Sequence, residues 1–178
     1  MKRLKVFFIL LFILTSFAYP LLAEEEKSGA CSKGDCQNGY GEAEMSEGEI
    51  KANYKGYFKD GKFHGKGELK KSDGYLYKGS WENNLPHGLG KARFSTGEMY
   101  YGYFKAGQAE GKGKFQDNEG NLYIGYFRNG LYNGKGKMIY KNGYIYEGEW
   151  KDDKKHGKGK LYKVVFDGEW NEDKPVKN

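Results

Sequence analysis

Aromatic and polar residues alternate along short stretches of the chain, and one such stretch returns at a fixed interval. In its clearest copy, Tyr77, Gly79 and Trp81 occupy alternate positions, with Lys78 and Ser80 between them. Successive side chains of a β-strand point to opposite faces, so the stretch predicts a strand with one aromatic and one polar face. The fixed period indicates an array of one small unit. Its first residue recurs every 23 residues, at Tyr54, Tyr77, Tyr100, Tyr123 and Tyr146.

A polar turn and a second strand follow each aromatic strand. In the clearest copy the turn contains Asn84. Asparagine, aspartate and glycine between two strand patterns are typical of β-hairpins, so each unit is predicted to be one hairpin. Glycine inside a strand often marks a place that a ring or another backbone approaches closely. A Gly-x-Gly pair follows each turn, at Gly65 and Gly67, Gly88 and Gly90, Gly111 and Gly113, Gly134 and Gly136, and Gly157 and Gly159.

The repeats define the expected domain organisation. A leader (1–23) and an acidic linker (24–36) precede an array that spans 37–178. The array opens with a partial unit (37–53) and ends in a truncated copy from Phe166 that resembles a closing cap. The many interrupting glycines leave no continuous amphipathic helix in the array. The repeated units begin at residues 54, 77, 100, 123 and 146.

We therefore expect an all-β fold, an elongated and open single antiparallel sheet of stacked hairpins, solenoid-like and preceded by a helical signal peptide. Two strands per unit at about 4.7 to 4.9 Å spacing give an array about 50 to 60 Å long. No deep core is expected in such a sheet. Its stability should come from aromatic contacts between adjacent units, each adding about 0.5 to 1.5 kcal/mol beyond its area term.

The recurring pattern Tyr-x-Gly-x-Trp/Phe, a turn, His-Gly-x-Gly and a further glycine seven residues on resembles the MORN repeat (membrane occupation and recognition nexus). The resemblance extends over about residues 37–173. It implies one β-hairpin per repeat, stacked into an elongated antiparallel sheet. It also implies roles as scaffolds and interaction modules, with some proposed lipid contacts.

The leader has the order of a secretory signal peptide. Three cations among the first five residues precede an apolar run of 18 residues, Val6 to Ala23, and three glutamates follow it. Ala23 is the expected cleavage site because it is small and ends the apolar run. The alternative is an uncleaved anchor, since a run of this length could just span a bilayer. In either case we expect export, to the periplasm, to the outer envelope or as a secreted protein.

The two cysteines lie just before the repeats. In an oxidising compartment Cys31 and Cys36 are expected to form a local disulfide. The alternatives are free thiols or lipidation of Cys31. Lipidation is disfavoured because Glu24 to Lys27 separate Cys31 from the apolar run, whereas a lipidated cysteine should follow that run directly. Two cysteines alone would leave the coordination of a metal unfilled. We expect neither a metal nor a cofactor.

The charge is unevenly distributed. Residues 24–50 hold 8 acids and 2 bases, whereas residues 51–178 hold 16 acids and 25 bases. The basic array favours anionic lipid, cell-wall polymer or an acidic protein face as partner, and not nucleic acid, which an exported protein rarely meets. Alternatively, the lysines simply face water and protect the sheet edges. Two basic rows would contact anionic lipid or polymer. They are Lys62, Lys66, Lys70 and Lys71, and Lys151, Lys154, Lys155, Lys158 and Lys160.

The histidines do not indicate catalysis. His64, His87 and His156 share one position of the repeat, where the other copies have Glu110 and Asn133. A residue that the repeat itself needs recurs in this way, whereas a catalytic residue should break the pattern in one copy. No nucleophile or acid partner accompanies any of them. The chain is therefore expected not to be an enzyme.

Recognition is the function that remains. Bulky rings on one face of a curled sheet predict a shallow aromatic trough that anchors a protein partner. The alternative is that the rings fill the space between units. We expect an exported scaffolding or protein-interaction module of the cell envelope, with binding of anionic lipid or wall polymer as the alternative. Homo-oligomers could form through the open sheet edges. The trough would consist of Tyr77, Trp81, Tyr100, Phe104, Tyr123, Phe127, Tyr146 and Trp150.

Overall fold

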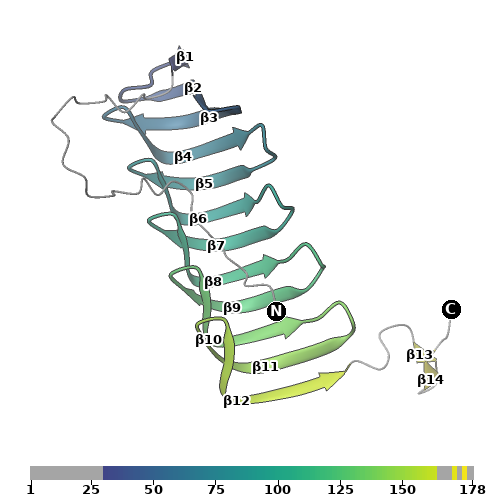
Figure 1. Ribbon diagram of the computed structural model, residues 1–178. Coiled ribbons are helices and arrows are strands. Elements are labelled where there is room, and N and C mark those ends of the chain that lie inside the picture. Colours follow the sequence, from purple (N-terminus) through teal and green to yellow (C-terminus); the bar gives the residue numbers. More distant parts are fainter. Residues whose placement is uncertain (1–29, 164–169, 172–173, 176–178) are drawn as a thin grey trace, which may run out of the picture.

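One antiparallel sheet of twelve strands contains most of the chain. The computed structural model describes residues 30–163, 170–171 and 174–175. Twelve strands are hydrogen-bonded in the order of the chain, and Figure 1 shows them as an elongated, open stack. The expected all-β sheet of hairpins is confirmed, and the expected signal peptide (1–23) lies outside the described residues. The strands are β1 (Ala30–Gly34), β2 (Tyr40–Glu47), β3 (Ile50–Lys59), β4 (Lys62–Lys71), β5 (Leu76–Glu82), β6 (Leu85–Arg93), β7 (Met99–Lys105), β8 (Gln108–Gln116), β9 (Leu122–Arg128), β10 (Leu131–Ile139), β11 (Tyr144–Lys151) and β12 (Lys154–Lys163).

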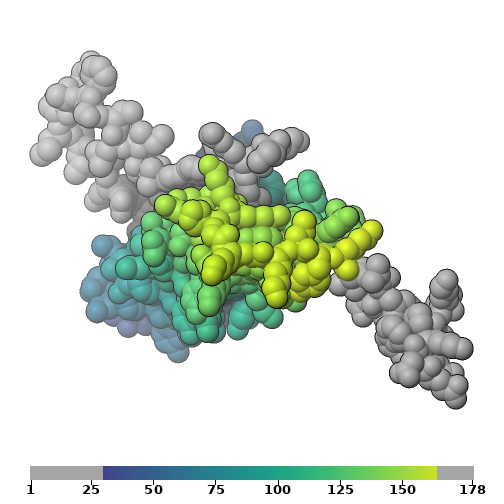
Figure 2. Space-filling view, turned by 90° about the horizontal axis from the view of Figure 1, so that it is seen from below, coloured from purple at the N-terminus to yellow at the C-terminus, as the bar shows by residue number. Residues whose placement is uncertain are grey.

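The two ends of the sheet differ from the expected boundaries. Residues 30–34, assigned above to a linker, form β1, which pairs with β2 and is tied to the following loop by a disulfide between Cys31 and Cys36. At the other end every residue of β12 is exposed, and Figure 2 shows this strand at the near end of the stack. Residues 166–169 of the expected closing copy lie outside the described residues. Two further strands, β13 (Trp170–Asn171) and β14 (Lys174–Pro175), pair with each other in a separate sheet.

The two glycines of each Gly-x-Gly pair are needed for different reasons. The first has φ between 55° (Gly157) and 70° (Gly88), the left-handed region in which glycine has no steric cost. It lies where a β-bulge shifts the register of the hairpin, as between Gly79 and Trp81 in β5–β6. The second glycine lies against the ring of the repeat tyrosine, because a Cβ at Gly90 would be 2.7 Å from Cε2 of Tyr77. A larger residue there would displace the ring.

The repeat tyrosine also braces the bulge. The ring of Tyr77 is fully buried over the paired Gly79 and Gly90, and its hydroxyl donates a hydrogen bond of 2.8 Å to the carbonyl of Ser80. The other four units repeat this bond at 2.9 to 3.1 Å. Tyrosine therefore recurs where phenylalanine would fill the same space without a donor. The bonds join Tyr54 to Tyr57, Tyr100 to Tyr103, Tyr123 to Tyr126 and Tyr146 to Glu149.

Aromatic rings connect each unit to the next along the inner face of the sheet. Tyr77 packs edge-on against Trp81 of its own unit, with ring centroids 4.8 Å apart, and against Phe104 of the next unit at 5.1 Å. Equivalent contacts between units join Tyr54 to Trp81, Tyr100 to Phe127 and Tyr123 to Trp150, at 5.0 to 5.4 Å. The core is thus a continuous row of rings, and each unit is stabilised by its neighbours.

Candidate interaction surface

The eight rings of the expected aromatic trough are buried. None is more than 7% exposed, and all eight belong to the hydrophobic core. The glycine pairs let the tyrosines lie down on the sheet, and the rings of adjacent units then cover one another. The alternative interpretation therefore holds for these rings: they fill the space between units, and a partner cannot reach them as a trough. The rings are those of Tyr77, Trp81, Tyr100, Phe104, Tyr123, Phe127, Tyr146 and Trp150.

Burial also suppresses the acidity of the first four repeat tyrosines. Desolvation raises the pKa of Tyr54, Tyr77, Tyr100 and Tyr123 well above the usual range of a phenol. Their hydroxyls remain protonated and act as donors to the backbone. These groups are therefore structural hydrogen-bond donors and not candidates for acid–base chemistry.

Several accessible tyrosines lie on the opposite, outer face of the sheet. Tyr57, Tyr103 and Tyr126 occupy one position of the repeat, three residues after the buried tyrosine, and are 44 to 54% exposed. An odd offset within a strand places them on the other face from the core. Tyr101, two residues before Tyr103, is exposed on the same face. The sequence shows these tyrosines at an odd offset from the repeat tyrosine, but the pattern of the repeat tyrosines pointed only to the opposite face.

Pairing of neighbouring strands brings lysines between these outer tyrosines. Tyr126 on β9 lies opposite Lys112 on β8, and Tyr101 on β7 lies opposite Lys91 on β6 and Lys114 on β8. The Nζ atom of Lys112 is 5.6 Å from the centroid of the Tyr126 ring, a cation–π distance. We call this region the central patch and define it by Lys91, Tyr101, Tyr103, Lys112, Lys114 and Tyr126.

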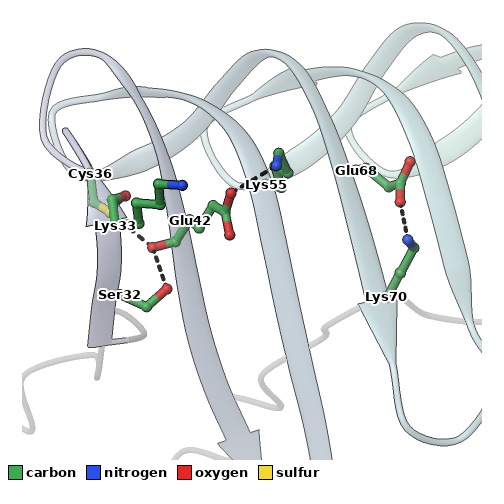
Figure 3. Close-up of polar contacts among 7 residues, drawn as sticks. All are labelled: Ser32, Lys33, Cys36, Glu42, Lys55, Glu68 and Lys70. Atoms are coloured by element: carbon green, nitrogen blue, oxygen red, sulfur yellow. Dashed lines mark hydrogen bonds and ion pairs between the residues drawn. The ribbon is translucent and has the colours of Figure 1, made fainter.

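Some lysines on either side of the central patch are paired with carboxylates. Figure 3 shows Lys55 beside Glu42 and Lys70 beside Glu68. The Nζ atoms lie 2.8 Å from Oε1 of Glu42 and 2.6 Å from Oε1 of Glu68. The Lys55 contact holds the pKa of Glu42 below its usual range, and the hydrogen bond from Lys70 is the largest cause of the lowered pKa of Glu68. Toward the other end, Lys137 pairs with Glu147 at 2.8 Å. These ion pairs lie on the strands that flank β6–β9.

Three lysines of the central patch have no such carboxylate partner among the described residues. Within residues 30–163, no carboxylate lies within 4.0 Å of the ammonium group of Lys91, Lys112 or Lys114. All three side chains belong to exposed residues. The middle of the outer face therefore combines exposed tyrosines with positive charge that the described part of the chain does not compensate.

The two expected basic rows do not form two continuous surfaces. Lys70 is paired with Glu68, and Lys66 donates to the hydroxyl of Ser80 at 2.8 Å. Lys155 lies on the inner face, with its Nζ atom 4.7 Å from the centroid of the Tyr146 ring. It stands where the other units have Phe63, Pro86, Ala109 and Tyr132. Lys155 thus covers the last repeat tyrosine, whereas Lys160 lies opposite Glu147 on the outer face.

The histidines remain on separate hairpins. His64, His87 and His156 belong to β4, β6 and β12, so the sheet holds them apart. His87 contacts Glu82 of its own hairpin, with Nδ1 3.0 Å from Oε2. Among the described residues there is no group of three side chains placed to hold a metal ion. The same part of the chain contains no helix able to cross a bilayer.

Comparison with known families identifies a repeat family. The model described as MORN repeat matches residues 54–74, 77–99, 100–122, 123–143 and 146–164, which together make up more than half of the chain. The matches begin at the five tyrosines that start the units. A comparison with curated proteins finds no match. No catalytic domain is identified in the chain.

Proposed function

The chain belongs to the MORN-repeat family, and from that premise we propose that it is an exported, non-catalytic module for protein interaction or scaffolding in the cell envelope. MORN repeats are generally protein-binding or membrane-binding modules. The observation that carries the proposal is the outer face of the sheet, where Tyr101, Tyr103 and Tyr126 are exposed while the inner rings are buried. Exposed tyrosines with few rotatable bonds are efficient anchors for a partner.

Binding can be tested with a fragment of residues 24–178, which contains every described strand. The fragment would be used as bait in envelope extract beside the double variant Tyr103→Ala/Tyr126→Ala. Tyr57→Ala is the matched control, since Tyr57 has the same repeat position and exposure but lies outside the central patch. A specific partner should be recovered by the parent and the control and lost with the double variant. Recovery that does not depend on the two tyrosines would contradict a role for the outer face.

Export needs its own measurement, because the leader lies outside the described residues. Fractionation of cells that express the full chain should place the protein outside the cytoplasm. N-terminal sequencing of that protein should begin at Glu24 if Ala23 ends a cleaved signal peptide. A chain that retains Met1 in a membrane fraction would favour the uncleaved anchor, and a cytoplasmic chain would refute export.

A second candidate function is binding of anionic membrane lipid or cell-wall polymer. The lysines of the central patch, which have no carboxylate partner within residues 30–163, favour it, because a positive surface attracts anions over a distance set by the salt concentration. Sedimentation with anionic and neutral vesicles at low and high salt tests the lipid form. Salt-sensitive binding to anionic vesicles alone would support it, and no binding at low salt would remove it.

Self-association through the sheet ends is a further proposed contact. The exposed strand β12 leaves backbone groups along one edge of the sheet, and such edges can pair with a second copy. Sedimentation velocity over a range of concentrations measures this. A Lys158→Pro substitution, within β12, should reduce any dimer that uses the edge, because proline removes a backbone donor.

A further inference from the structure

We propose that the central patch binds a linear acidic polysaccharide, which crosses strands β6–β9 with sugar rings against the tyrosines and carboxylates against the lysines. The proposal rests on the second candidate function above and names its ligand. It follows from three observations on the outer face: the spacing of the tyrosines, the placement of lysines between them and the absence of compensating carboxylates near those lysines in residues 30–163.

Tyrosine and lysine alternate along one line across the sheet. Lys112 on β8 lies directly opposite Tyr126 on β9, and Tyr103 on β7 lies beside the bulge of β8 that precedes Lys112, where a Cβ at Gly111 would be 4.0 Å from that of Tyr103. Neighbouring strands are about 4.7 to 4.9 Å apart, so the two tyrosines are separated by about 9 to 10 Å with a lysine midway. In a 1,4-linked polysaccharide of β-sugars, two successive rings span about this same length. Every second sugar would therefore meet a tyrosine, with a lysine near the sugar between.

The chemistry of the patch suits such a polymer. The C–H face of a pyranose ring is apolar and packs on aromatic rings, and Tyr103 and Tyr126 expose about half of their side-chain surface. A second line of side chains, Lys91 on β6, Tyr101 on β7 and Lys114 on β8, lies beside the first and widens the platform. Charged hydrogen bonds between ammonium and carboxylate groups would fix the position of the chain on this surface.

Two other acidic partners fit the spacing less well. An extended acidic peptide returns a side chain to the same face every two residues, about 6.6 to 6.8 Å, which does not match the separation of the tyrosines. An anionic bilayer offers charge without a directional repeat, so it would not select β6–β9 by spacing. Both remain outcomes of the experiment.

The probe is an oligosaccharide of β-1,4-linked mannuronic acid from alginate, titrated calorimetrically into the fragment 24–178. Cello-oligosaccharides of equal length keep the 1,4-linked β-sugar backbone without charge, and polyglutamate keeps the charge without sugar rings. Vesicles with and without anionic lipid are added as a fourth probe. The mannuronate should bind more tightly than the other three, with an affinity that falls as salt is raised.

Variants locate the binding on the patch. Tyr103→Ala, Tyr126→Ala and Lys112→Ala should each weaken mannuronate binding by about tenfold or more, as expected when one central contact of an interface is lost. Lys112→Arg should restore most of the affinity. Tyr57→Ala and Lys55→Ala are controls of matching chemistry outside the patch, and Lys55 is already paired with Glu42. All these side chains belong to exposed residues, so circular dichroism should show the parent fold throughout.

Several results would overturn the proposal. Equal affinity for polyglutamate would show that charge alone is recognised, and equal affinity for cello-oligosaccharides would show that the lysines play no part. Binding to anionic vesicles but not to mannuronate would replace the polymer by a membrane and leave the second candidate function standing. If no probe binds while protein capture still depends on Tyr103 and Tyr126, the polysaccharide is refuted and the interaction module is not.

Discussion

The hydroxyl of Tyr100 provides a direct test of how each hairpin is stabilised. Its ring is 2% exposed, and its Oη atom donates to the carbonyl of Tyr103 at 2.9 Å, beside the bulge of β7–β8. Tyr100→Phe removes this donor but keeps the ring contacts with Phe104 and Phe127, at 4.9 and 5.0 Å. Removal of one partner from a buried hydrogen bond should lower the free energy of unfolding by about 1 to 3 kcal/mol.

Tyr101→Phe is the matched control for this change. The neighbouring residue loses the same hydroxyl, but its side chain is exposed on the outer face, so stability should change by less than about 0.5 kcal/mol. Urea unfolding followed by tryptophan fluorescence compares the two variants. Amide hydrogen exchange of β7 and β8 adds a local measurement, since repeat arrays need not unfold as one unit. Equal effects of the two substitutions would refute the role of the buried hydroxyl as a brace.

Three further predictions concern two indoles and the ends of the sheet. The Nε1 atom of Trp150 donates to a backbone carbonyl at 3.2 Å, whereas that of Trp81 is buried without a partner in the described residues. Trp150→Phe should therefore lower the free energy of unfolding by about 0.5 to 1.5 kcal/mol more than Trp81→Phe, as measured by thermal unfolding. Burial raises the pKa of Asp153, so the folded state favours its protonated carboxyl group. This contribution to stability is present below the unfolded pKa of Asp153 and is lost as the pH rises through its folded pKa. Asp153→Asn should therefore raise Tm at pH 7 more than at pH 3, and a lower Tm at pH 7 would contradict this cause. Reduction of the disulfide between Cys31 and Cys36 should speed hydrogen exchange in β1, while equal acceleration in β7 would show that the bond affects more than the end strand.

Local pattern was enough to predict the type of fold. Alternation of Tyr77, Gly79 and Trp81 identified a strand with one aromatic and one polar face, and the turn at Asn84 identified a hairpin. The 23-residue period then required identical hairpins to stack in chain order, as the sheet does. β1 was missed because residues 30–34 lie before the repeats and have no aromatic alternation. Their pairing depends on contact with β2, supported by the disulfide between Cys31 and Cys36.

The candidate surface depended on contacts between strands that sequence spacing does not show. The sequence by itself determined which residues share a face, because that follows from the two-residue period of a strand. Only the tertiary structure decided that the inner rings cover one another and that Lys112 lies opposite Tyr126 on the outer face. It also decided that Lys55 has a carboxylate partner, whereas Lys112 has none among residues 30–163. Register and burial arise from pairing between separate strands, and these contacts distinguish the accessible surface from the core.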